Sequence, residues 1–242
     1  CGFVALIGQP NVGKSTLLNR LVGARIAIVS PKPQTTRTQI LGIRTRGNTQ
    51  LIFVDTPGIH GRRSTLLNKH MVRSALRSLE ETDNVLFLVD AARGVTAGDE
   101  RIANRLIEIG TPTLIGVNKI DLIPRAKLIP LLDRLGTLFP GKDVIPISAL
   151  RGENIRELLE TLTRDLPEGP ALYPGDEVTD QSERVLAQEM VREQLFFHTQ
   201  QEVPYSTAVA VDHFEEIPAS RLLRIYGTIY VERSSQKAIV IG

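Results

Sequence analysis

The stretch at residues 8–15 reads G-Q-P-N-V-G-K-S and constrains the fold of this chain more than any other feature. An apolar run at residues 3–7 precedes it, and a helical pattern follows it. A strand, a glycine-rich loop and a helix in this order predict a phosphate-binding loop, because glycines let successive backbone N–H groups point at phosphate oxygens. We expect the Lys14 ammonium to reach the outer phosphates and the Ser15 hydroxyl to bind Mg²⁺. The predicted contacts are Gly8, Gln9, Pro10, Asn11, Val12, Gly13, Lys14, Ser15 and Thr16. The alternative is an ordinary glycine-rich turn between a strand and a helix.

Composition narrows the class of protein. Apolar residues make up 42% of the 242 residues and charged residues 23%, an ordinary mixture for a globular protein with a buried core. No apolar run reaches the roughly 20 residues of a membrane-spanning helix. The single cysteine, Cys1, excludes an internal disulfide and fits the reducing cytoplasm. Because a strand pattern starts at once, we also expect that no signal peptide precedes the fold.

The charge is unevenly distributed along the chain. Residues 1–170 contain 23 Lys and Arg against 16 Asp and Glu, whereas residues 171–242 contain 6 against 11. A basic first part is compatible with polyanions such as nucleotides and RNA. An acidic second part is not what a complete nucleic-acid-binding surface predicts.

Apolar strand patterns alternate with helical patterns as far as residue 166, which predicts an α/β fold: a three-layer P-loop NTPase domain with a mostly parallel sheet. After the first strand, further strands are expected at residues 40–46, 50–55, 85–89, 113–117 and 144–147. Residues 167–180 are rich in Pro and Gly and indicate a linker. Residues 181–242 then contain one amphipathic helical pattern, two strand patterns and a final turn or helix. We therefore expect a domain at 1–166, a linker at 167–180 and a smaller α+β module at 181–242.

The second motif, Asp55-Thr56-Pro57-Gly58, follows the strand at residues 50–55. A carboxylate at this strand end can hold Mg²⁺ through water, and the backbone N–H of Gly58 can meet a γ-phosphate. Alone the motif is weak, because Asp, Pro and Gly are ordinary turn residues. Its position after a phosphate loop and a predicted hairpin favours the functional interpretation.

The third motif, Asn118-Lys119-Ile120-Asp121, lies at the end of the strand at 113–117. The Asp121 carboxylate can accept hydrogen bonds from guanine N1–H and the exocyclic amine, a donor pair that adenine lacks. Asn118 can contact the base and brace the phosphate loop, while the stem of Lys119 can lie along the base. A helix-capping loop is the alternative for a lone motif of this kind. After the next strand, Ser148, Ala149 and Leu150 offer backbone N–H groups to the guanine oxygen.

These segments occur in order, each at the carboxyl end of a predicted strand, where open α/β sheets bind ligands. Their combination predicts a guanine-nucleotide site. The proline-containing segment 30–37 then falls where a mobile switch loop would lie, and we expect Thr36 rather than Thr35 to reach Mg²⁺ when a γ-phosphate is present.

The motifs G-Q-P-N-V-G-K-S, P-Q-T-T-R, D-T-P-G-I, N-K-I-D and S-A-L together resemble the Era family of GTPases. The resemblance covers essentially the whole chain, since residues 230–242 are similar to the start of that family's C-terminal KH domain. It implies a G domain at 1–166 and a truncated, type II KH-like RNA-binding module at 181–242. It also implies GTP hydrolysis coupled to binding of 16S rRNA and the 30S precursor in ribosome assembly. The protein would be cytoplasmic, with peripheral association to the inner face of the cell membrane.

Two positions depart from common patterns. Ile59 stands where many small GTPases place a water-orienting Gln, so hydrolysis must use another group, an ion or a partner. The resemblance suggests a K⁺ ion held partly by Asn11, although Asn11 is equally an ordinary turn residue. Gly242 resembles the first glycine of a KH loop, whose clamp would follow it, so we expect GTP binding but poor RNA binding from residues 1–242 alone.

Three other functions stay open at this point. The chain could hold GTP structurally with negligible hydrolysis, an alternative that Ile59 supports. It could serve tRNA modification or another ribosomal subunit, as related GTPases with different appendages do. It could be an ATPase, against which Asn118 and Asp121 argue.

Overall fold

The computed structural model describes residues 1–30, 32, 39–55, 82–217 and 222–241. The chain divides into two compact units. One unit consists of residues 1–26 and 36–180, and the other consists of residues 27–35 and 181–242.

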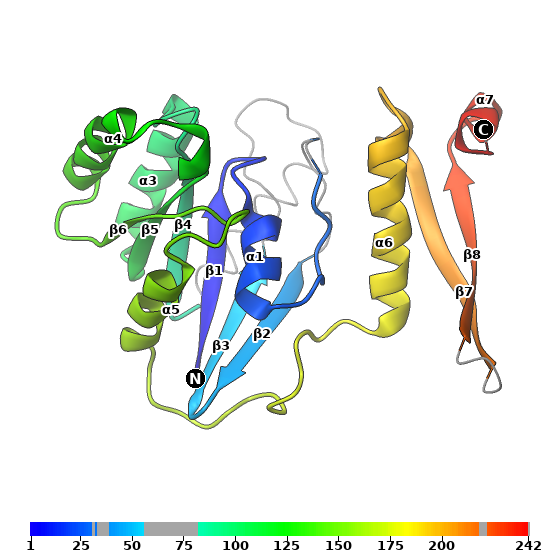
Figure 1. Cartoon of the computed structure of the whole chain (residues 1–242), viewed down its shortest axis with the longest axis horizontal. Coiled ribbons are helices and arrows are strands. Elements are labelled where there is room, and N and C mark those ends of the chain that lie inside the picture. Colours follow the sequence, from blue (N-terminus) through cyan, green and yellow to red (C-terminus); the bar gives the residue numbers. More distant parts are fainter. Residues whose placement is uncertain (31, 33–38, 56–81, 218–221, 242) are drawn as a thin grey trace. The chain divides into compact units, whose positions relative to one another are not determined.

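The first unit is built on a six-stranded sheet with the order β2-β3-β1-β4-β5-β6 (Figure 1). Its strands are β1 Gly2–Gly8, β2 Ile40–Arg46, β3 Thr49–Asp55, β4 Asn84–Asp90, β5 Thr113–Asn118 and β6 Val144–Pro146. Only the edge strand β2 is antiparallel to its neighbour, and the other pairs are parallel. The carboxyl ends of the parallel strands therefore meet at one edge of the sheet, and the predicted α/β fold is confirmed.

Four described helices accompany this sheet: α1 Lys14–Val22, α3 Ala97–Ile109, α4 Arg125–Leu138 and α5 Ile155–Arg164. A short 3₁₀ turn, Ile120–Leu122, follows β5. In Figure 1, α1 and α5 lie in front of the sheet. The opposite face packs against α3 and α4, so the unit has three layers.

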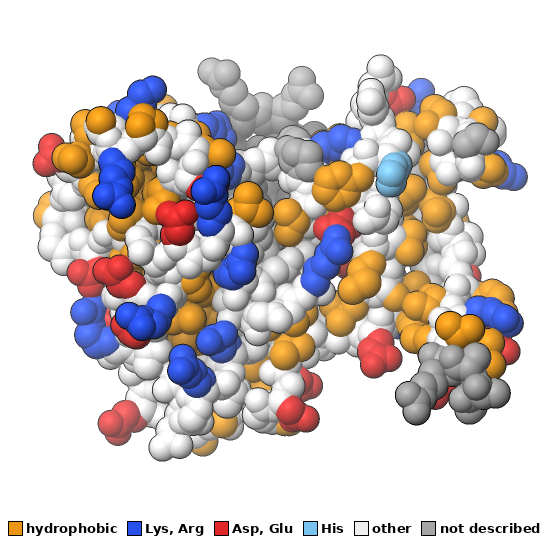
Figure 2. Space-filling model, viewed as in Figure 1, with side chains coloured by type: hydrophobic (Ala, Val, Ile, Leu, Met, Phe, Trp, Pro, Cys, Tyr) orange, Lys and Arg blue, Asp and Glu red, His pale blue; other side chains and the backbone are white. Residues whose placement is uncertain are grey.

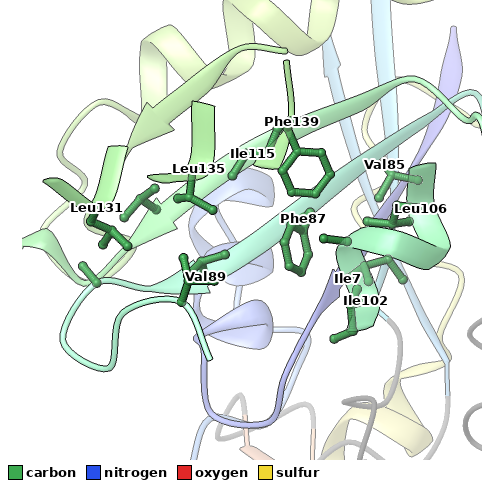
Figure 3. Packing of buried hydrophobic residues seen from close by; sticks show 14 of the residues in the cluster. Ile7, Val85, Phe87, Val89, Ile102, Leu106, Ile115, Leu131, Leu135 and Phe139 are labelled. Atoms are coloured by element: carbon green, nitrogen blue, oxygen red, sulfur yellow. The ribbon is translucent and has the colours of Figure 1, made fainter. Parts of the chain in front are cut away.

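The core on the α3 and α4 side consists of alternate residues of the central strands. Val85, Phe87 and Val89 of β4 point toward this cluster, where Leu106 and Leu135 meet them from the two helices (Figure 3). Phe87 is fully buried, and its ring centroid lies 5.7 Å from that of Phe139. Burial of this apolar surface holds the central strands rigid beneath the edge at which the predicted motifs lie.

Local sequence signals determine where the helices begin and end. Thr96 and Asp99 form a capping box at the start of α3, each side chain accepting from the other residue's backbone N–H. Gly110 ends the same helix in the left-handed conformation, with φ at 76°. On β2, a Cβ at Gly42 would lie 2.4 Å from Leu18, so a glycine there permits the close approach of α1.

The Pro- and Gly-rich segment after α5 is attached to the first unit. The buried Gln50 side chain accepts hydrogen bonds from the backbone N–H groups of Leu172 (2.8 Å) and Tyr173 (3.0 Å). Further along, the Ile43 N–H donates to the carbonyl of Val178 at 2.9 Å. The segment therefore runs along the β2 edge instead of standing away from it.

The second unit contains α6 Glu183–His198, β7 Thr207–Ile217, β8 Leu222–Val231 and α7 Ser234–Ile241, with a 3₁₀ turn at Val203–Tyr205. The strands β7 and β8 pair antiparallel, and the final turn or helix expected from the sequence is the helix α7. Within this unit, the Val29 N–H donates to the buried carboxylate of Glu193 at 3.0 Å, and the Lys32 ammonium donates to the carbonyls of Phe196 and Thr199. Among the residues that the structure describes, no helix has the length and apolar character needed to cross a membrane.

Candidate nucleotide-binding site

The predicted phosphate loop connects the end of β1 to the start of α1. Its last residue, Gly13, caps α1 with φ at 101°, a conformation that favours glycine. A Cβ at this position would also lie 2.3 Å from the Nδ2 atom of Asn118. Glycine at position 13 is therefore required both by the turn and by the neighbouring loop. Pro10, Val12 and Thr16 lie in or directly after this turn.

Lys14, the first residue of α1, folds back over the loop. Its buried ammonium donates to the carbonyls of Gly8 and Gln9, each at 3.1 Å. Burial lowers the pKa of Lys14 to about 8, and the nearby charge of Asp55 only partly opposes this effect. Because this ammonium has lost most of its hydration, a phosphate oxygen beside it would stabilise its charge strongly.

Ser15 and Asp55 bring a hydroxyl and a carboxylate together beside Lys14. Ser15 Oγ donates to Asp55 Oδ2 at 2.8 Å, and Asp55 is fully buried at the end of β3. One hydroxyl and one carboxylate beside a phosphate loop form the oxygen donor set with which Mg²⁺ is held in nucleotide sites. The residues present thus fit this ion.

Asn118 connects the phosphate loop to two neighbouring segments. Its Nδ2 donates to the Val12 carbonyl at 2.8 Å, and its Oδ1 accepts from the Ala149 N–H at 2.9 Å. Both ends of the buried amide are therefore used in bracing. The sequence predicts that Asn118 contacts the base and braces the phosphate loop, and these two hydrogen bonds correspond to the bracing role.

Lys119 also contacts the phosphate loop, at the Asn11 carbonyl. Its backbone adopts the left-handed conformation with φ at 68°. The ammonium lies 2.7 Å from the Asp90 carboxylate and 2.5 Å from the Asn11 carbonyl. These contacts orient the aliphatic part of the Lys119 side chain, which we expect to lie along the purine.

Asp121 is held by the segment after β6. Ser148 Oγ donates to its Oδ1 at 2.6 Å, and the Arg151 guanidinium lies 3.8 Å from its Oδ2. The Asp121 side chain is only 5% exposed. A carboxylate oriented in this way at the carboxyl edge of the sheet can accept two adjacent N–H donors of a base.

Comparison with known proteins identifies the family. The family model described as a 50S ribosome-binding GTPase matches residues 3–119. GTPase Era of Syntrophus aciditrophicus is 51% identical over 241 residues, which cover 100% of this chain and 78% of the relative. GTPase Era of Geobacter metallireducens is 45% identical over the same length and is covered to 80%. The chain belongs to the Era family of GTPases.

Solved structures of Era extend the similarity to both units. A crystal structure of Era with MgGDPNP and nucleotides 1506–1542 of 16S ribosomal RNA matches with a TM-score of 0.92 and 43% identity. A variant of Aquifex aeolicus Era bound to GDP·AlF₄⁻ matches with a TM-score of 0.92 and 42% identity. Each match covers all of this chain and 82% of the other. The expected family and fold are confirmed.

In this member of the Era family, the described site residues gather at one edge of the sheet. They are residues 8–16, Asp55, Asn118, Lys119, Asp121 and residues 148–150. The expected contacts of Thr36 and of Thr56, Pro57, Gly58 and Ile59 lie outside the described residues. So does Gly242, on which the expectation of a KH loop depends.

Three contributors were not expected from the sequence. Asp90 ends β4 and pairs with Lys119, and the rule that placed Asp55 at a strand end could have indicated it. Thr96 Oγ1 accepts from Nε2 of the predicted loop residue Gln9 at 2.5 Å and connects the start of α3 to the phosphate loop. Arg20 of α1 contacts the segment that contains Ala149 and Leu150, and no motif marks it.

Proposed function

We propose that this Era-family chain binds GTP at the edge formed by residues 8–16, 118–121 and 148–150 and hydrolyses it to GDP and phosphate. The observation that carries the proposal is the Asp121 carboxylate, which Ser148 orients on the same braced edge as the phosphate loop. Asn118 joins the two regions through Val12 and Ala149. A nucleotide spanning them would meet N–H donors and an ammonium at its phosphates and a carboxylate at its base.

Catalysis would come from positioning and charge. The attacking group is water, and the bond that breaks joins the γ-phosphorus to the bridging oxygen of GDP. The Lys14 ammonium would stabilise negative charge on the phosphates, and the backbone N–H groups of the loop would fix their orientation. Gly58 and Thr36 would sense the γ-phosphate and release the switch segments after hydrolysis.

Magnesium would be held by Ser15, by Thr36 and, through water, by Asp55. The 2.8 Å pairing of Ser15 with Asp55 supports this assignment, because it places both oxygen donors beside Lys14. When bound, Mg²⁺ would neutralise charge on the β- and γ-phosphates.

Potassium would take the part that a glutamine or an arginine finger plays elsewhere. Ile59 has no polar atom with which to orient water. Asn11 adopts the left-handed conformation with φ at 63°, and its carbonyl is held by Lys119. The Asn11 side chain would then be a K⁺ ligand at the phosphate loop.

The partner would be 16S rRNA and the small-subunit precursor, bound with the help of the KH-like module. This follows from the solved Era complex with nucleotides 1506–1542, which matches the whole chain. The GTPase would act in the cytoplasm, with peripheral contact to the inner face of the membrane.

Phosphate release tests the proposal. Purified protein should hydrolyse GTP but not ATP in the presence of Mg²⁺ and K⁺, and turnover is measured with and without an RNA of the 1506–1542 sequence. A scrambled RNA of equal length is the control. GTP binding without measurable turnover in all of these mixtures would favour the alternative that Ile59 supports, a structural GTP-binding module.

A further inference from the structure

Arg20 joins the last turn of α1 to the segment that follows β6. Its Nε donates to the carbonyl of Ala149 at 3.1 Å, and its Nη2 donates to the carbonyl of Leu150 at 2.5 Å. One guanidinium therefore holds two successive peptide carbonyls. The rigid, planar arrangement of its donors suits this task, whereas a lysine could satisfy only part of it.

The three N–H groups around these carbonyls have different partners. The Ala149 N–H donates to Asn118 Oδ1, and the Arg151 N–H donates to Ser148 Oγ at 3.0 Å. The Leu150 N–H makes no hydrogen bond to any residue that the structure describes. It is the donor of this segment that remains available for a ligand.

Peptide geometry connects Arg20 to that donor. In a planar trans peptide, the carbonyl of one residue and the N–H of the next point in opposite directions. Because Arg20 holds the Ala149 carbonyl toward α1, the Leu150 N–H must point away from α1. Its direction is therefore set by a side chain that lies on the far side of the segment.

We propose that Arg20 is a positioning residue for recognition of a 6-oxopurine: it aims the Leu150 N–H at the O6 atom of guanine. The inference rests on the guanine-nucleotide site proposed above. It adds a second connection between the two halves of the site, because Arg20 lies on α1, the helix that begins directly after the phosphate loop. Asn118 is the first such connection.

A purely structural Arg20 would have a different signature. Basic side chains are scattered over the face that carries α1 and α5 (Figure 2). Most exposed arginines contribute little to the stability of a fold. If the contact is purely structural, its loss should loosen the segment and weaken the binding of every nucleotide equally. If Arg20 positions the Leu150 N–H, its loss should weaken the binding of only those nucleotides that have an oxygen at C6.

The test measures diphosphate binding to the full chain by titration calorimetry. The variants are Arg20→Ala and Arg20→Lys, with Arg156→Ala as the control, because Arg156 is an exposed arginine of α5 paired only loosely with Glu160 at 3.5 Å. The ligands are GDP, IDP, ADP and 2-aminopurine riboside diphosphate, which has hydrogen in place of O6 and therefore also lacks the N1–H donor.

In Arg20→Ala, the hydrogen bond from the Leu150 N–H to O6 is no longer oriented, so the affinity for GDP and IDP should fall about fivefold to tenfold. Binding of the 2-aminopurine diphosphate should change by less than about twofold. The affinity of Arg20→Lys for GDP and IDP should lie between those of the wild type and Arg20→Ala. This variant keeps the test usable if Arg20→Ala unfolds. Arg156→Ala should match the wild type.

Equal weakening of GDP, IDP and the 2-aminopurine diphosphate, or no weakening of GDP, would overturn the role of Arg20. Failure of the underlying site would look different, because the wild-type protein would then bind GDP no more tightly than ADP.

Discussion

Ser148 Oγ donates a 2.6 Å hydrogen bond to Asp121 Oδ1, although the two residues are 27 positions apart in the chain. This bond crosses from the segment after β5 to the segment after β6. It occupies one lone pair of the carboxylate and fixes the plane of the group. The remaining lone pairs are directed by that plane, so a base must present its N–H donors in one orientation.

Replacing Asp121 with Asn should change the preferred base. The amide keeps one acceptor and gains a donor, which suits xanthine, where a carbonyl replaces the exocyclic amine of guanine. GTP affinity should fall about 100-fold, while XTP affinity should rise above that of the wild type. Competition with a fluorescent nucleotide measures both. Ser148→Ala is the matched control: it should weaken GTP only about fivefold and leave XTP binding weak.

Lys14 should be needed for nucleotide binding and yet reduce the stability of the nucleotide-free protein. Desolvation is the larger cause of its lowered pKa, so the buried ammonium is less stable than it is in water. Lys14→Met should lower GTP affinity at least about 100-fold and raise the free energy of unfolding at pH 7. Lys142→Met, at an exposed position, should change neither.

The pH dependence of that stability difference follows from the sign of the shift. The folded-state pKa is about 8 and the unfolded value is 10.5, so the penalty is present in full below pH 8. Between pH 8 and 10.5 the folded chain has released its proton while the unfolded chain keeps it, and the penalty declines. Urea unfolding at about pH 7 and about pH 9.5 should therefore show a smaller advantage of Lys14→Met at the higher pH. An advantage that grows with pH would contradict the assignment.

Asn11→Ala should remove most of the stimulation of GTP hydrolysis by potassium. If the side chain is a K⁺ ligand, exchanging NaCl for KCl at constant ionic strength should accelerate the wild type at least about tenfold more than the variant. GDP affinity should change little, because the backbone N–H groups of the loop remain. Unchanged potassium stimulation in Asn11→Ala would exclude this residue as a ligand.

The core beneath the site should be intolerant of truncation. Phe87 is fully buried and packs against Phe139, so Phe87→Ala should cost about 3–5 kcal/mol in the free energy of unfolding. Ile107, on the same unit, is 54% exposed, and Ile107→Ala should cost less than about 0.5 kcal/mol. Urea denaturation of the nucleotide-free proteins measures both.

Much of the first unit could be predicted from the sequence because its determinants are local. Thr96 and Asp99 cap a helix three residues apart, and the apolar residues of β4 form one continuous run. The fold therefore followed from patterns within short windows. So did the positions of Asp55, which ends β3, and of Asp121, which lies in the 3₁₀ turn after β5. These are the parts of the site for which spacing and chemistry agree.

Contacts between distant segments could not be predicted in this way. The two carbonyls held by Arg20 belong to residues about 130 positions later, and no pattern within α1 distinguishes this arginine from an exposed one. The same limit applies to residues 167–180: their composition indicates a linker, but not that Gln50 holds Leu172 and Tyr173. Such contacts depend on how elements pack after the strands have been ordered.

Gln50 should therefore control the attachment of that linker. Its side chain accepts from two linker N–H groups and donates to the Tyr173 carbonyl at 2.8 Å, all at a position that is 2% exposed. Gln50→Leu keeps the side-chain size but leaves these backbone groups without their partner, which should cost about 2 kcal/mol. Proteolysis between residues 167 and 175 should become faster, as detected by mass spectrometry of the fragments. Lys127→Leu on α4 is the control, and equal cleavage rates in the two variants would show that Gln50 does not hold the linker.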